Sequence, residues 1–116
     1  MDQIVLGLHA ERVVTVTEDM TARNLGSGQL PVYSTAAMIA LMEAASIEAI
    51  EHLLPPGQAS VGTAFTIEHF AATPVGDEVR AQAEVIEVEG PKVVFEVRAW
   101  DGEDLIGEGT HVRFII

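Results

Sequence analysis

Hydrophobic residues along the second half of the chain gather in runs separated by short groups of turn residues. The runs are rich in β-branched and aromatic residues, which is typical of β-strands. The predicted strands are Ala59 to Ala72, Glu78 to Val88, Lys92 to Trp100 and Leu105 to Ile116. The turn residues lie at 73–77, 89–91 and 101–102. Because these connections are short, we expect the four strands to form an antiparallel meander.

The first half of the chain predicts one strand and one long helix. Glu11 to Val16 is β-branched and predicts a strand. The helix begins at Ser34 or Thr35, either of which can cap it, and continues to Leu54, before Pro55-Pro56-Gly57. One strand, one helix and four antiparallel strands make an α+β fold in a single domain spanning residues 1–116.

The predicted helix is apolar on most of its sides, so we expect it to be wrapped on most sides by a curled sheet. In a chain of 116 residues, part of the apolar surface would then remain unburied. The simplest way to bury that surface is a two-fold homodimer, although a tetramer is an alternative.

Charge and composition exclude several classes of function. With 18 Asp and Glu against 6 Lys and Arg, the net charge is -12, which repels nucleic acids and anionic membrane surfaces. The absence of cysteine excludes disulfides, thiol catalysis and cysteine-based zinc sites. The N-terminus has no signal-peptide pattern, and Thr35 to Ile47 is too short to span a bilayer, so we expect a cytoplasmic protein.

Three side chains are candidates for chemistry. By helical projection Glu43 lies among Ile39, Ile47 and other apolar residues, so it is either a base or nucleophile or a structural partner of an arginine or a backbone donor. His69 alternates onto the same strand face as Phe65 and is either a catalyst or a hydrogen-bonded core residue. Thr35 either caps the helix or orients a reacting group.

Other sites of common enzyme chemistry are not indicated. His9, His52, His69 and His111 have no metal-ligand spacing, so we expect no metal. The chain has no nucleophile elbow, no Walker loop and no dinucleotide-binding glycine pattern, so we expect no nucleotide cofactor. Any polyanionic ligand would have to use the few arginines or backbone N–H groups.

Several motifs together resemble the fluoroacetyl-CoA thioesterase family. They are Val32-Tyr33-Ser34-Thr35 followed by Leu41-Met42-Glu43, then Gly62-Thr63-Ala64, His69-Phe70-Ala71-Ala72-Thr73-Pro74, and Gly107-Glu108-Gly109-Thr110-His111-Val112-Arg113. The joint pattern runs from the first predicted strand to the C-terminus. The resemblance implies a hotdog fold, in which a curled antiparallel sheet wraps a long central helix.

The resemblance also implies a function and a site. Family members work as dimers that hydrolyse acyl-CoA thioesters without a metal or other cofactor, so acyl-CoA is the expected substrate. Thr35, Glu43 and His69 match the family's catalytic threonine, glutamate and histidine. Gly62 matches a glycine that lines the family's active site, and Arg23 and Arg113 match family arginines that we assign to substrate binding.

The segment between Arg23 and Val32 departs from the family pattern. It is shorter than the family loop and contains no phenylalanine that could act as a lid. We therefore expect a different or broader short acyl group than fluoroacetyl. Two other functions stay open at this level: a non-catalytic acyl-CoA or small-ligand binding protein, and a hydratase or dehydratase of enoyl-CoA on the same fold.

Overall fold

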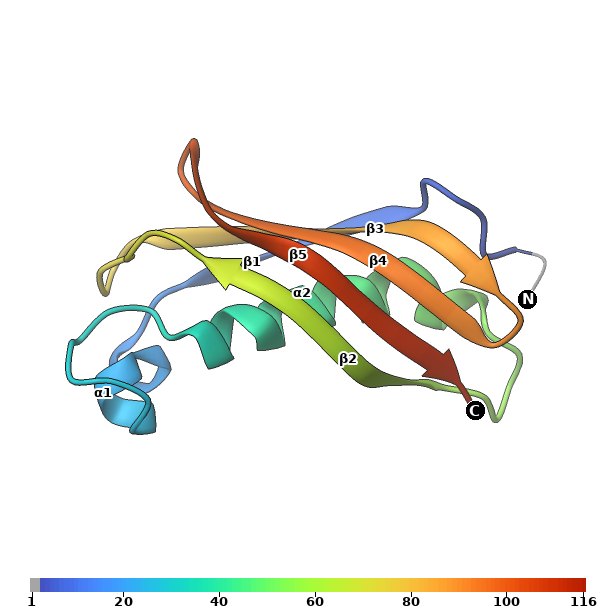
Figure 1. The fold of residues 1–116 in the computed structure, drawn as a ribbon, viewed down its shortest axis with the longest axis horizontal. Coiled ribbons are helices and arrows are strands. Elements are labelled where there is room, and N and C mark those ends of the chain that lie inside the picture. The colour runs from blue at the N-terminus through green and yellow to red at the C-terminus, as the bar shows by residue number, and fades with distance from the viewer. Residues whose placement is uncertain (1–2) are drawn as a thin grey trace.

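The computed structural model describes residues 3–116, and its main feature is one curved antiparallel sheet packed on one long helix (Figure 1). The first two residues of the predicted domain lie outside the described residues. The strands are β1 (His9–Thr15), β2 (Ser60–His69), β3 (Glu78–Glu89), β4 (Lys92–Asp101) and β5 (Asp104–Ile115). The helices are α1 (Ala22–Leu25) and α2 (Thr35–Ile50), with short 3-10 turns at Glu18–Met20 and Glu51–Leu53. The predicted α+β hotdog fold is confirmed.

The sheet has the order β1-β3-β4-β5-β2, so the predicted four-strand meander is wrong for its first strand. β3, β4 and β5 follow one another as predicted, but β2 pairs with β5 at one edge and β1 pairs with β3 at the other. The segment after β2 is not a hairpin turn, because Thr73 accepts a backbone hydrogen bond from Tyr33. It passes the residues that precede α2 and joins the edge strand β2 to β3, which lies next to the opposite edge of the sheet.

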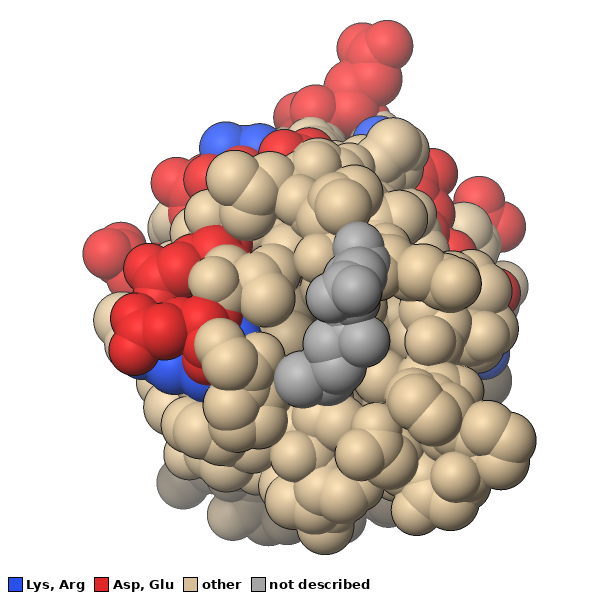
Figure 2. Space-filling model, turned by 90° about the vertical axis from the view of Figure 1, so that its right-hand side faces the viewer, with Lys and Arg blue, Asp and Glu red and all other residues tan. Residues whose placement is uncertain are grey.

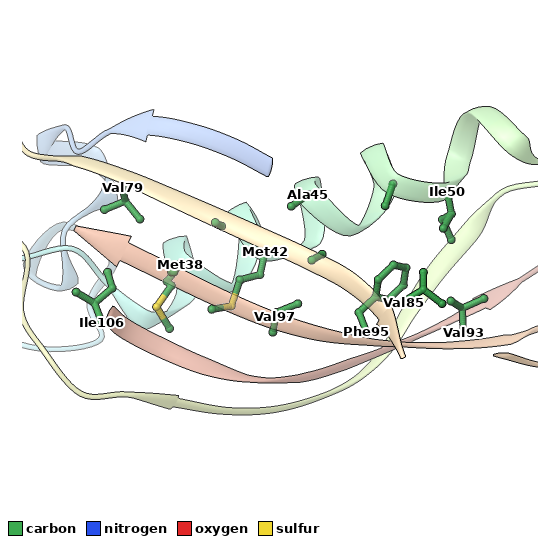
Figure 3. Packing of buried hydrophobic residues seen from close by; sticks show 14 of the residues in the cluster. Met38, Met42, Ala45, Ile50, Val79, Val85, Val93, Phe95, Val97 and Ile106 are labelled. Atoms are coloured by element: carbon green, nitrogen blue, oxygen red, sulfur yellow. The ribbon is translucent and has the colours of Figure 1, made fainter. Parts of the chain in front are cut away.

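The core lies between α2 and the concave face of the sheet (Figure 3). Met38, Met42, Ala45 and Ile50 of the helix point toward alternate residues of the strands, which are buried because a strand turns every second side chain to one face. The strand residues in contact with them include Val79, Val85, Val93, Phe95, Val97 and Ile106. The packed stripe of the helix is therefore narrower than its apolar sequence suggested.

The expectation that the sheet wraps most sides of the helix is wrong for the single chain. α2 packs chiefly against β1 and β3, and Ala36, Ala40 and Ile47 on its other side are exposed. The regular helix also ends at Ile50, four residues before the predicted end at Leu54, and continues as the 3-10 turn Glu51–Leu53.

Charged side chains are unevenly distributed over the molecule. At the end where the C-terminus lies, acidic side chains gather toward one side while most of the remaining surface in this view is uncharged (Figure 2). The N-terminus of α2 lies at the opposite end of the long axis (Figure 1). No helix among residues 3–116 has the length and apolar character required to cross a membrane.

Candidate active site

The N-terminus of α2 carries a hydroxyl that is not used for capping. Ser34 is the N-cap, and its Oγ accepts a hydrogen bond from the amide of Ala37 at 3.0 Å. Thr35 is the first helical residue, and its Oγ1 lies 2.8 Å from Nδ1 of His69. The sequence left either residue as the cap, and the structure assigns this role to Ser34, which frees Thr35 for contact with His69.

His69 ends β2 and turns its ring toward the helix. It lies on the same partly buried face as Phe65 and Ile67, as the alternation predicted, and its ring meets that of Tyr33 edge to face at 6.5 Å between centroids. Burial lowers the pKa of His69, and the nearby backbone of Ala71 partly opposes this shift. The neutral imidazole is therefore favoured near pH 7 and is able to accept a proton.

Thr35 and His69 line a cleft of about 440 Å³. The other lining residues are Ala22, Ser27, Val32, Tyr33, Ser34, Ala36, Phe70, Ala71 and Ala72. None of them is acidic, although the chain carries 18 carboxylates. Thr35 and Ala36 line the cleft at the helix N-terminus, where backbone amides have no acceptor inside the helix, so this end of the helix favours a developing negative charge.

Tyr33 is a further polar residue of the cleft that the sequence analysis did not single out. Its side chain is only 2% exposed, and burial raises the pKa of its phenol to about 12. Its hydroxyl has no hydrogen-bond partner within residues 3–116, and the same holds for Nε2 of His69. The sequence signals for Tyr33 were its position just before the helix start and its place in the motif Val32-Tyr33-Ser34-Thr35.

Glu43 lies two helical turns farther along α2 and belongs to a second group of residues. Its carboxylate Oε2 lies 3.3 Å from Nη1 of Arg113 and 3.9 Å from Nε2 of His111, both on β5. The side chain remains 40% exposed. The long side chain reaches past its apolar helical neighbours to Arg113, which is the arginine contact that the sequence left open as one of two alternatives.

Gly62 of β2 faces the same carboxylate. A Cβ atom at this position would lie 2.6 Å from Oε2 of Glu43 and 3.0 Å from Cε1 of His111. Only a residue without a side chain lets the strand backbone approach Glu43 so closely. A shift in strand register at Gly62 accompanies this approach, which places Glu43 against the edge strand of the sheet.

The predicted site residues thus form two groups within one chain. Thr35 and His69 meet at one end of α2, while Glu43, Gly62 and Arg113 meet farther along it. Glu43 comes eight positions after Thr35, or about 12 Å along the helix axis at the usual rise per residue.

Arg23 belongs to neither group. It lies on α1 beside the cleft residue Ala22, and its exposed guanidinium is 3.5 Å from Glu18.

Three residues around Arg113 were not assigned a role by sequence reasoning: Glu51, Ser60 and His111. They make hydrogen bonds to each other or to Arg113. Alternation along β5 places His111 and Arg113 on one face, but nothing in the sequence shows that Glu51 and Ser60 meet them. Among residues 3–116 no three His, Asp or Glu side chains are grouped as ligands for a metal ion.

A five-stranded antiparallel sheet curved over one long helix defines a hotdog-fold protein, and solved structures agree with this assignment. A hot-dog-like protein of Thermanaerovibrio acidaminovorans superposes with a TM-score of 0.88 at 30% identity, over 96% of this chain and 82% of that one. Residues 16–116 match the family described as fluoroacetyl-CoA-specific thioesterase. The chain belongs to this family, which confirms the resemblance seen in its motifs.

Two relatives specify the similarity further. The fluoroacetyl-CoA thioesterase of Streptantibioticus cattleyicolor is 46% identical over 85 residues, which is 73% of this chain and 61% of that relative's length. The crystal structure of the fluoroacetyl-CoA thioesterase FlK superposes with a TM-score of 0.92 at 38% identity, covering 99% of this chain and 90% of that one.

Proposed function

We propose that the protein is an acyl-CoA thioesterase that hydrolyses a short acyl-CoA to the free acid and CoA. The observation that carries this proposal is the hydrogen bond between Thr35 and His69 inside a cleft without acidic residues. A neutral imidazole, a hydroxyl and free helix amides are the groups that addition to a thioester carbonyl requires. Membership of a thioesterase family supports the same chemistry.

The reaction forms a C–O bond at the thioester carbonyl and breaks the C–S bond. In the proposed mechanism Thr35 polarises or positions the carbonyl, and the first-turn amides of α2 stabilise the oxyanion. Glu43 acts as the nucleophile or as the base that activates water. His69 serves as general acid or base: its neutral imidazole takes a proton from the attacking water and passes that proton to the departing CoA sulfur. Where Glu43 is the nucleophile, this water is the one that hydrolyses the anhydride formed on Glu43. These side chains are sufficient for hydrolysis without a cofactor.

The proposed enzyme works as a homodimer whose active sites combine two chains. In one chain Glu43 is about 12 Å along the helix from Thr35, too far to share a substrate carbonyl with it. β2 is an edge strand, and its residues 61–64 are exposed, including Val61 at 40%. Antiparallel pairing of two such edges would set the Gly62 end of one strand, with its Glu43, opposite the His69 end of the other.

Mixing two inactive variants tests the shared site. Glu43→Gln and His69→Ala chains, exchanged as subunits, should form heterodimers with one intact site, which restores about a quarter of wild-type activity after statistical mixing. If each chain held a complete site, the mixture would stay inactive. Light scattering should give the mass of a dimer or tetramer, and a monomeric active enzyme would contradict the proposal.

The substrate is expected to be a short acyl group without strict selection for fluoroacetyl. The loop after α1 is exposed and has no aromatic residue that could close over the cleft, although its Ser27 lines the cleft. Arg23, beside this loop, is the proposed contact for a phosphate of CoA, and Arg113 is proposed to serve the site through Glu43.

Thiol release from a panel of short and medium acyl-CoA substrates tests the activity. Wild-type release that is lost in Glu43→Gln and His69→Ala, with folding verified by circular dichroism, is the expected result. Tight binding of acyl-CoA without thiol release would contradict hydrolysis and indicate a binding protein.

A further inference from the structure

A chain of hydrogen bonds runs from the end of α2 through β2 and β5 to Glu43. Glu51 accepts hydrogen bonds from both the amide and the hydroxyl of Ser60, at 3.0 and 2.8 Å. Arg113 donates from Nε to the hydroxyl of Ser60 at 2.8 Å and from Nη2 to its carbonyl at 3.0 Å. The remaining nitrogen, Nη1, lies 3.1 Å from Nε2 of His111 and 3.3 Å from Glu43.

The contacts of His111 determine which of its nitrogens carries hydrogen. Nδ1 lies 2.9 Å from the carbonyl oxygen of Ala64, which only accepts, so Nδ1 is the donor. Nε2 therefore has a free lone pair and accepts the hydrogen bond from Arg113. The ring is fully buried and stacks on Phe65 with 3.8 Å between centroids. His111 is thus held as one neutral tautomer in one orientation.

Arg113 is consequently fixed in place and turned toward Glu43. Its side chain is almost completely buried, and Ser60 and His111 bind it on three of its nitrogens. Such fixed contacts leave the guanidinium little rotational freedom, so the position of Nη1 is decided before Glu43 is engaged. An arginine that is buried and whose nitrogens already have hydrogen-bond partners is better suited to orienting a carboxylate than to binding a mobile phosphate.

We propose that His111, Ser60 and Glu51 are positioning residues that act through Arg113 to hold the carboxylate of Glu43 beside Gly62. This inference rests on the proposed function, in which Glu43 acts on the thioester. The three residues do not touch the substrate. They fix the direction of the Glu43 carboxylate, and an error of about 1 Å in such a direction is costly for the rate.

The arrangement depends on a neutral His111. Protonation of Nε2 would remove the acceptor for Arg113 and set two cations against each other. The groups around the ring are Arg113 on β5, Glu43 on α2 at 3.9 Å, and the Ala64 carbonyl and Phe65 ring on β2. From β4 the neighbour is Phe95, at 6.2 Å between centroids. Burial, the largest effect, and the charge of Arg113 oppose protonation of the ring, while the hydrogen bond to the Ala64 carbonyl and the charge of Glu43 favour it.

Substitution of His111 tests the proposal by kinetics. His111→Phe retains a ring on Phe65 but has no acceptor, and it should lower kcat by about 10- to 100-fold with little change in KM. Ser60→Ala should lower kcat in the same way. His111→Gln, which offers an amide oxygen to Arg113, should recover part of the rate. Phe95→Leu, a packing change beside the same ring, is the matched control and should retain kcat.

Nitrogen NMR of the His111 side chain tests the geometry without any enzymatic activity. The expected state at pH 7 is the tautomer with hydrogen on Nδ1. Hydrogen on Nε2 would overturn the proposal, and so would wild-type kcat in folded His111→Phe. If the wild type hydrolyses no acyl-CoA, the proposed function fails, and a crystal structure of His111→Phe decides the positioning role: an unmoved Glu43 carboxylate would refute it.

Discussion

The hydroxyl of Thr35 lies 2.8 Å from Nδ1 of His69, although the two residues are 34 positions apart in the chain. The contact joins the first residue of the long helix to the last residue of an edge strand. It exists because Ser34 caps the helix and leaves the threonine hydroxyl free. The same pair lines the cleft in which the acyl group is proposed to bind.

Two neighbouring substitutions should separate stability from activity at this helix start. Ser34→Ala removes the cap of Ala37 and should lower the free energy of unfolding by about 1 kcal/mol. Thr35→Val keeps the shape of an exposed side chain and should leave stability nearly unchanged while it strongly reduces thiol release. Urea unfolding and kcat measured on both variants check this, and equal activity of Thr35→Val and wild type would remove Thr35 from the mechanism.

The rate should depend on pH through His69. Because burial lowers its pKa, the imidazole remains neutral to a pH below its ordinary value near 6.5. The acid limb of kcat/KM should therefore fall at a pH below about 6.5 if His69 acts as a base. A profile measured from pH 5 to 8 checks this, and an acid limb that persists unchanged in the residual activity of His69→Ala would assign it to another group.

Stability should also fall on acidification, because His69 and His111 both have lowered pKa values in the folded chain. Above about pH 6.5 these two histidines are neutral in both the folded and the unfolded chain, and their contribution to the free energy of unfolding is complete. As the pH falls below that value the unfolded chain binds protons first, so the free energy of unfolding decreases until the folded-state pKa values are passed. Urea unfolding at pH 7.5, 6.5 and 5.5, at one protein concentration, measures the slope. His111→Phe should reduce it, and an unchanged slope would contradict the assignment.

Gly62→Ala should displace Glu43, because the added Cβ would lie 2.6 Å from its Oε2. Activity should fall while the fold is retained. A double-mutant cycle on stability identifies the cause: Gly62→Ala should be less destabilising in the Glu43→Ala background, where the clashing carboxylate is absent. Equal costs in both backgrounds would mean that the effect arises from His111, whose Cε1 would lie at 3.0 Å.

Tyr33→Phe should stabilise the protein. The hydroxyl of Tyr33 is buried and has no partner within residues 3–116, so its removal should raise the free energy of unfolding by about 1 kcal/mol. Thermal and urea unfolding of the variant check the sign. A loss of stability would show that an ordered water serves the hydroxyl in solution.

Sequence alone determined the elements of this protein and the types of residue in its site. The helix that begins at Ser34–Thr35 and the strands separated by glycine and proline turns were predictable because capping, periodicity and turn chemistry act over a few neighbouring residues. The alternation that places His69 beside Phe65 is equally local. The resemblance to the family further predicted that Thr35, Glu43 and His69 act together, which stays a prediction.

Only the tertiary structure decided which of these residues meet. Pairing of β2 with β5 rather than β3 depends on the path of the chain past the start of α2, which no local pattern encodes. The same pairing brings Ser60 to Arg113 over 53 positions and thereby creates the network that holds Glu43. Contacts between distant residues follow from the packing of the whole sheet on the helix, so they are absent from any short stretch of sequence.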